Sequence, residues 1–143
     1  MDGMIDARRL SLGHALDLAA RVRTEAEARD LALAVCVVDP GGHPIASARM
    51  DGAALGAIAL ADGKAYTAVL WAMPSGALHQ STQPGGPDWG FNTTDRRVVV
   101  YAGGLPLFVD GALVGGVGAS GGTAEQDEEC VRAAATALGF AVE

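Results

Sequence analysis

The stretch Gly103–Asp127, GGLPLFVDGALVGGVGASGGTAEQD, decides the fold of this chain. Asp110-Gly111 lies between two apolar runs, which is a strong hairpin signal because a tight primed turn needs positive φ. The next strand contains three glycines, and glycines in a strand usually mark close approach of a ligand or another backbone. Thr123–Gln126 forms a capping box that opens the last helix. The backbone N–H groups of Ser120–Thr123 are therefore expected near a helix N-terminus, where they favour an anion or a carbonyl oxygen.

Two helices and a second hairpin are predicted before this stretch. Ser11 can cap a helix that runs to about Asp30, with apolar residues along one stripe. The apolar run Leu33–Val38 has the length of a strand, and the turn Asp39–Gly42 leads to a returning strand, His43–Ala48. The Ala- and Leu-rich segment Asp51–Trp71 predicts a second helix, either continuous or broken near Gly56 or Gly63, with Asp51 well placed as its N-cap.

The remaining segments complete an α+β chain. Gln83–Asp95 is a long, polar, turn-rich loop, and loops of this length are usually functional or mobile. The other predicted elements are a short helix at Ser75–Ser81, strands at Arg97–Tyr101, Pro106–Val109 and Ala112–Ala119, and a final helix at Thr123–Phe140. Two hairpins in this order predict an antiparallel sheet with helices packed against it, in one domain that spans residues 1–143.

The composition excludes several classes of partner. Ten basic and 17 acidic residues give a net charge of -7, and no basic stripe is present, so nucleic acid is not expected to bind. No apolar run is long enough to span a membrane, and the N-terminus lacks a signal-peptide pattern, which predicts a cytoplasmic protein without membrane partners. Cys36 and Cys130 match no metal-site spacing, so no metal site is predicted.

Four segments resemble the GlcG/HbpS family of small haem-binding or "haem-degrading" proteins, which includes the carboxy-terminal domain of PduO-type proteins. The matching segments are VVDPGGHPIASARMDGA (37–53), GKAYTA (63–68), GGLPLFVDGALVGGVGASGG (103–122) and EQDEECVRAA (125–134). The resemblance implies a profilin-like fold with a central antiparallel sheet. It also implies homo-oligomers, commonly octamers built from dimers, with ligand pockets near subunit contacts. Haem is the first ligand that the family suggests, and no other cofactor is expected.

Arg49 and Lys64 are the cations singled out by this comparison. Arg49 could bind a carboxylate bidentately, or it could pair structurally with an acidic residue. Lys64 lies among small apolar residues, where it either extends to water or faces a pocket as a charge or a base. Asp51 and Thr67, close to these cations in the family motifs, are included among the predicted ligand-binding residues.

Aromatic residues and glycines complete the predicted site. Trp89 and Phe91, in the long loop, are expected to contact a ligand or a neighbouring subunit, whereas Trp71 is expected in the core. Close backbone approach and loop N–H donors add the positions Gly103, Gly104, Gly118, Ser120, Gly121 and Gly122. The three histidines are His14, His43 and His79; each is interpreted as a surface or structural residue, and haem is not demanded by their placement.

Two functions follow as hypotheses. The first is a homo-oligomeric protein that binds a haem-like compound or a small carboxylate or carbonyl compound. The alternative is a cofactor-independent isomerase, lyase or cyclase, in which Lys64 or a carboxylate acts as a base while Arg49 and the loop N–H groups stabilise an oxyanion.

Overall fold

A four-stranded antiparallel sheet with strand order β2-β1-β4-β3 forms the centre of the molecule. The computed structural model describes residues 3–143. Its strands are β1 (Ala34–Val38), β2 (Pro44–Arg49), β3 (Gly104–Val109) and β4 (Ala112–Ser120); its helices are α1 (Leu12–Glu27), α2 (Ala57–Trp71) and α3 (Ala124–Ala137), with short 3₁₀ helices η1 (Ser75–Leu78) and η2 (Phe91–Thr93). The predicted α+β class, an antiparallel sheet with helices packed against it, is confirmed.

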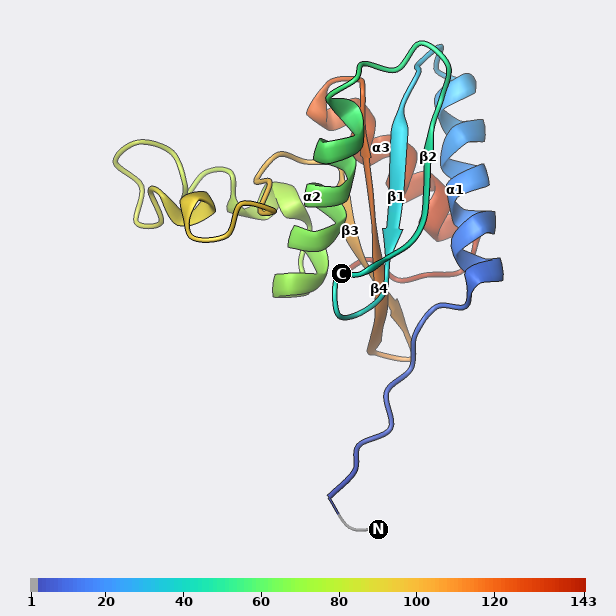
Figure 1. The fold of residues 1–143 in the computed structure, drawn as a ribbon, viewed down its shortest axis with the longest axis horizontal. Helices are drawn as coiled ribbons and strands as arrows, with labels where there is room; N and C mark the ends of the chain where they lie inside the picture. Colours follow the sequence, from blue (N-terminus) through green and yellow to red (C-terminus); the bar gives the residue numbers. More distant parts are fainter. Residues whose placement is uncertain (1–2) are drawn as a thin grey trace.

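The helices cover the two faces of the sheet unequally. α2 lies on one face, whereas α1 and α3 lie together on the other (Figure 1). Successive residues of the central strand β1 point to opposite faces. Cys36 and Val38 therefore pack with α2, while Val35 and Val37 pack with α1 and α3. Burial on both faces explains why the β1 sequence is continuously apolar rather than alternating.

Two segments project from this layered body (Figure 1). Residues 3–9 form an exposed N-terminal arm without regular structure. Leu10 itself is buried, and its backbone N–H donates to the Val114 carbonyl oxygen at 3.0 Å, so the packed body begins there. The second segment is the loop at residues 79–96, which we name the long loop. It follows α2 and η1 and extends away from the sheet.

Glycines on β4 allow α2 to lie directly on the sheet. A Cβ atom on Gly118 would come within 2.3 Å of the Ala61 carbonyl oxygen, and one on Gly116 within 3.0 Å of the Ala65 carbonyl oxygen. Both contacted atoms belong to the backbone of α2, which cannot swing aside as a side chain can. The sequence left two explanations for these strand glycines, close approach of a ligand or of another backbone. At Gly116 and Gly118 the structure shows close approach of the α2 backbone.

The predicted strand at Arg97–Tyr101 is wrong. This segment runs along α2 without joining the sheet, and the Val99 N–H donates to Thr67 Oγ1 on α2 at 2.9 Å. The backbone hydrogen bond that would have paired it with a strand is made with a helix side chain instead. Burial alternates along its three valines: Val98 and Val100 are buried, whereas Val99 is partly exposed.

The second helix begins at Ala57 rather than at Asp51, so the predicted N-cap role of Asp51 is also wrong. Asp51 and Gly52 form a turn, with Gly52 at φ +84°, and the N-cap position is Gly56, which provides no side-chain hydrogen bond. The turn after β2 needs residues that the sequence pattern had assigned to the helix.

Candidate functional site

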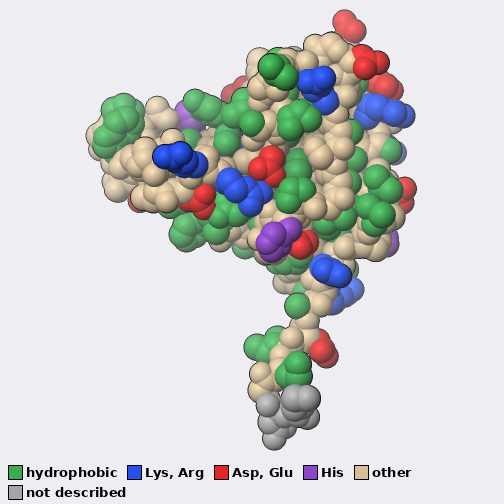
Figure 2. Space-filling model, viewed as in Figure 1, with side chains coloured by type: hydrophobic (Ala, Val, Ile, Leu, Met, Phe, Trp, Pro, Cys, Tyr) green, Lys and Arg blue, Asp and Glu red, His purple; other side chains and the backbone are tan. Residues whose placement is uncertain are grey.

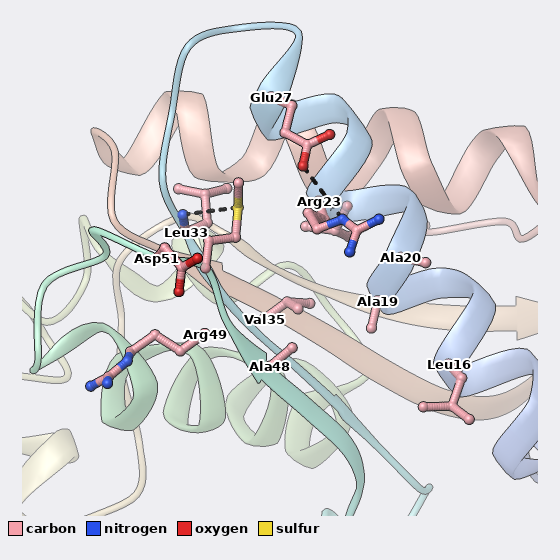
Figure 3. Close-up of a pocket in the computed structure, with 12 residues that line it drawn as sticks. Leu16, Ala19, Ala20, Arg23, Glu27, Leu33, Val35, Ala48, Arg49 and Asp51 are labelled. Carbon is pink, nitrogen blue, oxygen red and sulfur yellow. Dashed lines mark hydrogen bonds and ion pairs between the residues drawn. The ribbon is translucent and has the colours of Figure 1, made fainter.

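A cleft of about 610 Å³ lies between α1 and the edge strand β2. We name it the α1–β2 cleft, and Figure 3 shows most of its lining side chains. It includes two predicted site residues, Arg49 and Asp51, which come from the end of β2 and the following turn. The other lining residues are Leu16, Ala19, Ala20, Val22, Arg23, Glu27, Leu33, Val35, Ala48 and Met50.

Charged and apolar side chains occupy different ends of this cleft (Figure 3). Arg23 and Glu27 on α1 form an ion pair at 3.5 Å near the end where β2 leads into its turn. Asp51 lies at the same end, whereas the Arg49 side chain points away from the cleft, toward the side of the sheet that α2 covers (Figure 3). Within residues 3–143 neither side chain has a hydrogen bond or an ion pair. The opposite end is apolar and contains Leu16. The cleft is therefore amphipathic along its length.

A second cleft, of about 480 Å³, lies where the N-terminal arm joins α1; we name it the His14 cleft. Ser11 caps α1 by accepting a hydrogen bond from the His14 N–H at 3.2 Å, and its Oγ also lies 3.0 Å from His14 Nδ1. Apolar side chains from β3, β4 and the C-terminal segment line the same cleft as this exposed imidazole, and two arginines of the N-terminal arm line it as well. The lining residues are Arg8, Arg9, Leu10, Ser11, His14, Val109, Val114 and Phe140.

The other two histidines have different surroundings. His43 Nδ1 lies 3.2 Å from the Asp39 carboxylate in the turn between β1 and β2. The His79 ring lies against Tyr101, with ring centroids 5.8 Å apart. Across residues 3–143, no group of three or more histidine, cysteine or acidic side chains is arranged to hold a metal ion.

Lys64 lies inside the protein rather than in the α1–β2 cleft. Its Nζ donates to Asp127 Oδ2 at 2.8 Å and to the Ala119 carbonyl oxygen at 3.0 Å. Its side chain is 3% exposed and that of Asp127 is 2% exposed. Lys64 therefore links α2 to α3 past the end of β4, and it does not lie beside Arg49 in that cleft. Its predicted role as a base or ligand-binding residue stays a prediction.

The loop that leads into α3 uses its N–H groups internally. The Gly122 N–H donates to Asp127 Oδ1 at 2.8 Å, and the Thr123 N–H donates to Gln126 Oε1 at 2.9 Å. The chain's own side chains thus occupy the positions predicted for an anionic ligand. Ser120 is buried, and a Cβ on the other predicted positions would meet protein atoms: Gly103, Gly104, Gly118 and Gly121. Ligand contacts by these residues stay predictions.

The predicted aromatic residues lie on the side of α2 that faces away from the sheet. Trp89 is 67% exposed in the long loop, and Phe91 packs against Trp71 with ring centroids 5.6 Å apart. Trp71 is 47% exposed, so its predicted core position is wrong. The α2 side chains that pack on the sheet are Ala57, Ala61, Ala65 and Val69, and Trp71 lies on a different side of the helix. Thr67 is buried and donates to the Gly63 carbonyl oxygen at 2.7 Å, in addition to its bond from Val99.

A polar network that the sequence did not indicate joins the long loop to α2. The Arg97 guanidinium donates to Asp62 Oδ1 at 3.0 Å and to the Gly42 carbonyl oxygen at 2.8 Å, and it lies 4.0 Å from the centre of the Tyr66 ring. Tyr66 donates to Asp95, and this hydrogen bond raises the pKa of Tyr66. Two adjacent arginines at positions 96 and 97 were the only sequence signal for this anchor.

The cysteine thiols carry no indication of reactivity. Both are buried, and burial raises the pKa of Cys36 to about 12 with a further contribution from the neighbouring Asp62 carboxylate. Burial also raises the pKa of Cys130. At neutral pH both thiols are therefore protonated.

The face shown in Figure 2 has charges of both signs. On the face in Figure 2, basic and acidic side chains are interspersed among apolar ones, without a broad area of one sign. None of the helices found within residues 3–143 combines the length and the apolar character needed to cross a membrane.

Comparisons with known proteins identify similar chains over nearly the whole length. The family described as "Haem degrading protein HbpS-like" matches residues 10–136. A 15.0 kDa protein encoded between dhaT and dhaS in Citrobacter freundii is 34% identical over 119 residues, which are 82% of this chain and 84% of that protein. The corrinoid adenosyltransferase PduO of the same organism is 35% identical over 126 residues, which are 87% of this chain but 37% of PduO.

A solved structure is similar at the level of the backbone. The complex of PduOC with heme has a TM-score of 0.90 and 32% sequence identity, and the match covers 94% of this chain and 99% of that one. The resemblance noted from the sequence segments is thus confirmed for both sequence and fold.

Proposed function

Because this chain belongs to the HbpS-like family of haem-degrading proteins, we propose that it is a homo-oligomeric haem-binding protein that uses the His14 cleft. One observation carries the choice of site. Among the three histidines, His14 lies in a cleft that also contains arginines and apolar walls. The volume of about 480 Å³ falls in the usual range for small-molecule and cofactor pockets. The structure of PduOC with heme, a similar chain, supports haem as the ligand.

The residues of the His14 cleft fit the parts of a haem. Haem iron takes an axial nitrogen ligand and supplies the redox and ligand-binding chemistry of the group. His14 can offer Nε2 when Nδ1 carries the proton and donates to Ser11 Oγ, the contact at 3.0 Å. Arg9, which has no ion pair within residues 3–143, would bind a propionate carboxylate. Val114 and Phe140 are apolar surfaces for the porphyrin ring.

Replacing His14 with alanine is expected to weaken haem binding by roughly tenfold or more, because the axial nitrogen is lost. The measurement is a hemin titration followed by the Soret band, whose position should also shift in the variant. His43→Ala and His79→Ala are matched controls, since each removes an imidazole that lies outside the His14 cleft. A His14→Ala protein with an unchanged band and affinity would show that haem is held elsewhere.

The oligomeric part of the proposal rests on exposed apolar side chains. Leu70 and Trp71 on α2 are 42% and 47% exposed, and Trp89 on the long loop is 67% exposed. Trp71 also packs against Phe91 of the long loop, with ring centroids 5.6 Å apart. Contiguous exposed apolar side chains are typical of surfaces that bind other proteins. A second copy of this chain would cover them, in a dimer from which a larger assembly such as an octamer could be built.

Replacing Trp71 with glutamate is expected to shift the protein toward monomers, because a charge would be buried in the proposed subunit contact. Sedimentation velocity at micromolar concentration should give an even-numbered oligomer for the unmodified protein and a smaller species for Trp71→Glu. Leu138→Glu is the control, since Leu138 is 40% exposed and follows α3, which lies on the other face of the sheet. A monomeric unmodified protein would contradict the proposal.

A further inference from the structure

We propose that the free edge of β2 and the adjacent α1–β2 cleft bind the N-terminal arm of a second copy of this chain. Residues 3–7 of that copy would lie along β2 as a fifth strand, with the Ile5 side chain inserted into the cleft. This contact uses a different surface from the one proposed around Trp71, and it involves no ligand, so it can be tested separately from the proposed function.

The outer edge of β2 has backbone groups without a strand to pair with. β2 is at one edge of the sheet, and β1 is its only neighbouring strand within residues 3–143. The Met50 N–H donates to the Leu33 carbonyl oxygen at 2.9 Å, so Met50 directs its backbone groups toward that neighbour. Alternate residues of an antiparallel strand direct these groups to opposite sides. Ser47 and Arg49 therefore direct theirs outward, where another strand can bond to them.

The opposite edge of the sheet is already partly covered. β3 forms an antiparallel bridge with the C-terminal segment, in which the Phe108 N–H donates to the Ala141 carbonyl oxygen at 2.8 Å. Exposed strand edges pair readily with other chains, and charged residues or proline usually protect them. Pro44 and Arg49 are at the ends of β2, whereas the middle of its edge is uncharged. The edge of β2 is thus the one more open to strand addition.

The α1–β2 cleft is the space that the side chains of an added strand would enter. Ala48 faces α1, because it lies opposite Val35 in the sheet. Ala19, Val35 and Ala48 lie around the middle of the cleft (Figure 3). Their short side chains leave a volume of about 610 Å³ open. A strand beside β2 directs every second side chain to this face, so one large apolar side chain would be buried here.

The N-terminal arm provides a side chain of this kind. Met4 and Ile5 are 74% and 94% exposed, and the arm projects away from its own sheet (Figure 1). Arg8 pairs with Asp110 at 3.0 Å, which holds the base of the arm to its own body and leaves residues 3–7 available to a neighbour. Five extended residues span about 17 Å, which is close to the length of β2. Binding to a second copy would remove both apolar side chains from water.

Charge and register agree with this pairing. In an antiparallel arrangement with Ile5 opposite Ala48, Asp6 lies opposite Ser47. The Asp6 side chain then lies on the same side of the sheet as Arg49, its diagonal neighbour on β2. Neither Asp6 nor Arg49 has an ion pair within residues 3–143. The arm would therefore place an acidic group beside a basic one while its apolar side chain enters the cleft.

The decisive experiment is disulfide trapping between different chains. Ile5→Cys protein is mixed with Ala48→Cys protein and oxidised with glutathione disulfide. These positions would form a non-hydrogen-bonded pair with Cα atoms about 4.5 Å apart, a separation that a disulfide can bridge. We expect a covalent link between positions 5 and 48, identified by mass spectrometry of the linked peptides. The natural cysteines are both buried, so they are not expected to compete.

Two controls make the result specific. Met4→Cys mixed with Ala48→Cys should link roughly tenfold less, because residue 4 points to the other side of the added strand. Adding Trp71→Glu to both mixed chains should leave the link between positions 5 and 48 intact. That link would then be independent of the subunit contact proposed on α2, which may fail without affecting this one.

The size of the assembly gives a second measurement. Ile5→Asp would bury a charge in the cleft, so sedimentation velocity at micromolar concentration should give a smaller species than the unmodified protein. Met4→Asp is the matched control and should leave the size unchanged. Both residues are exposed, so these variants are expected to fold. The proposal is overturned if mixed chains form no link between positions 5 and 48, or if Ile5→Asp leaves the assembly unchanged. A link found only within a single chain carrying both cysteine substitutions would also overturn it, by showing that the arm covers its own cleft.

Discussion

Replacing Lys64 with alanine is expected to lower the free energy of unfolding by about 3–5 kcal/mol, because it leaves the Asp127 carboxylate as an unpaired charge in the interior. The two side chains are 3% and 2% exposed and are joined at 2.8 Å. The Ala119 carbonyl oxygen also loses its donor. Urea-induced unfolding followed by circular dichroism measures the effect, and Asp127→Ala should give a loss of similar size.

The double variant Lys64→Met with Asp127→Leu tests the cause. It removes both charges and keeps apolar volume, so it should recover most of the stability that either single substitution loses. Arg23→Ala is the matched control, since Arg23 belongs to an exposed i,i+4 ion pair worth at most about 1 kcal/mol. A Lys64→Ala protein as stable as the unmodified one would show that this ion pair does not hold α2 to α3.

The same variants bear on the predicted chemistry of Lys64. If a structural ion pair is its whole role, the double variant should bind hemin with unchanged affinity. A loss of ligand binding or of turnover in a folded double variant would instead support the alternative in which Lys64 acts at a site. This comparison separates stability from function, which a single alanine substitution cannot do.

Replacing Gly118 with alanine is expected to lower the free energy of unfolding by about 1–3 kcal/mol or more, through overpacking. The added Cβ would lie 2.3 Å from the Ala61 carbonyl oxygen and 2.6 Å from the Ala65 nitrogen. Because both atoms belong to the backbone of α2, the whole helix would have to move away from β4. The measurement is again urea-induced unfolding, and the midpoint should fall.

Gly56→Ala is the control for this substitution. Gly56 stands at the N-cap of α2 with φ −71°, and a Cβ there would meet nothing within 4 Å. The change in stability should therefore be a fraction of that at Gly118. If the two variants unfold at the same urea concentration, close packing of α2 on the strand glycines does not limit the sequence at Gly118.

The parts of the fold that short-range interactions control were predictable from the sequence. The Asp110-Gly111 turn has positive φ at both residues, as its hairpin signal indicates. The Thr123–Gln126 capping box has both of its reciprocal hydrogen bonds. In each case the interacting atoms are at most three residues apart, so the pattern contains all the partners. The continuous apolar run of β1 was likewise enough to indicate a strand buried on both faces.

Segments with distant partners were not predictable in the same way. Arg97–Tyr101 has the composition of a strand, but Thr67 supplies the hydrogen-bond acceptor for Val99, 32 residues away. The start of α2 was misplaced because the turn after β2 competes for Asp51 with a helix cap that uses the same residue type.

The sequence by itself determined the α+β class, both hairpins, the family and a short set of candidate residues, because turn chemistry, capping and periodicity act within a few positions. Only the tertiary structure decided which residues those candidates contact. It separated Lys64 from Arg49 by pairing the lysine with Asp127, 63 residues away. It also brought Asp51 to a cleft whose other wall comes from α1, and it turned the Arg49 side chain away from that cleft. Packing distributes residues between the interior and the surface according to partners far along the chain, and no local pattern encodes those partners.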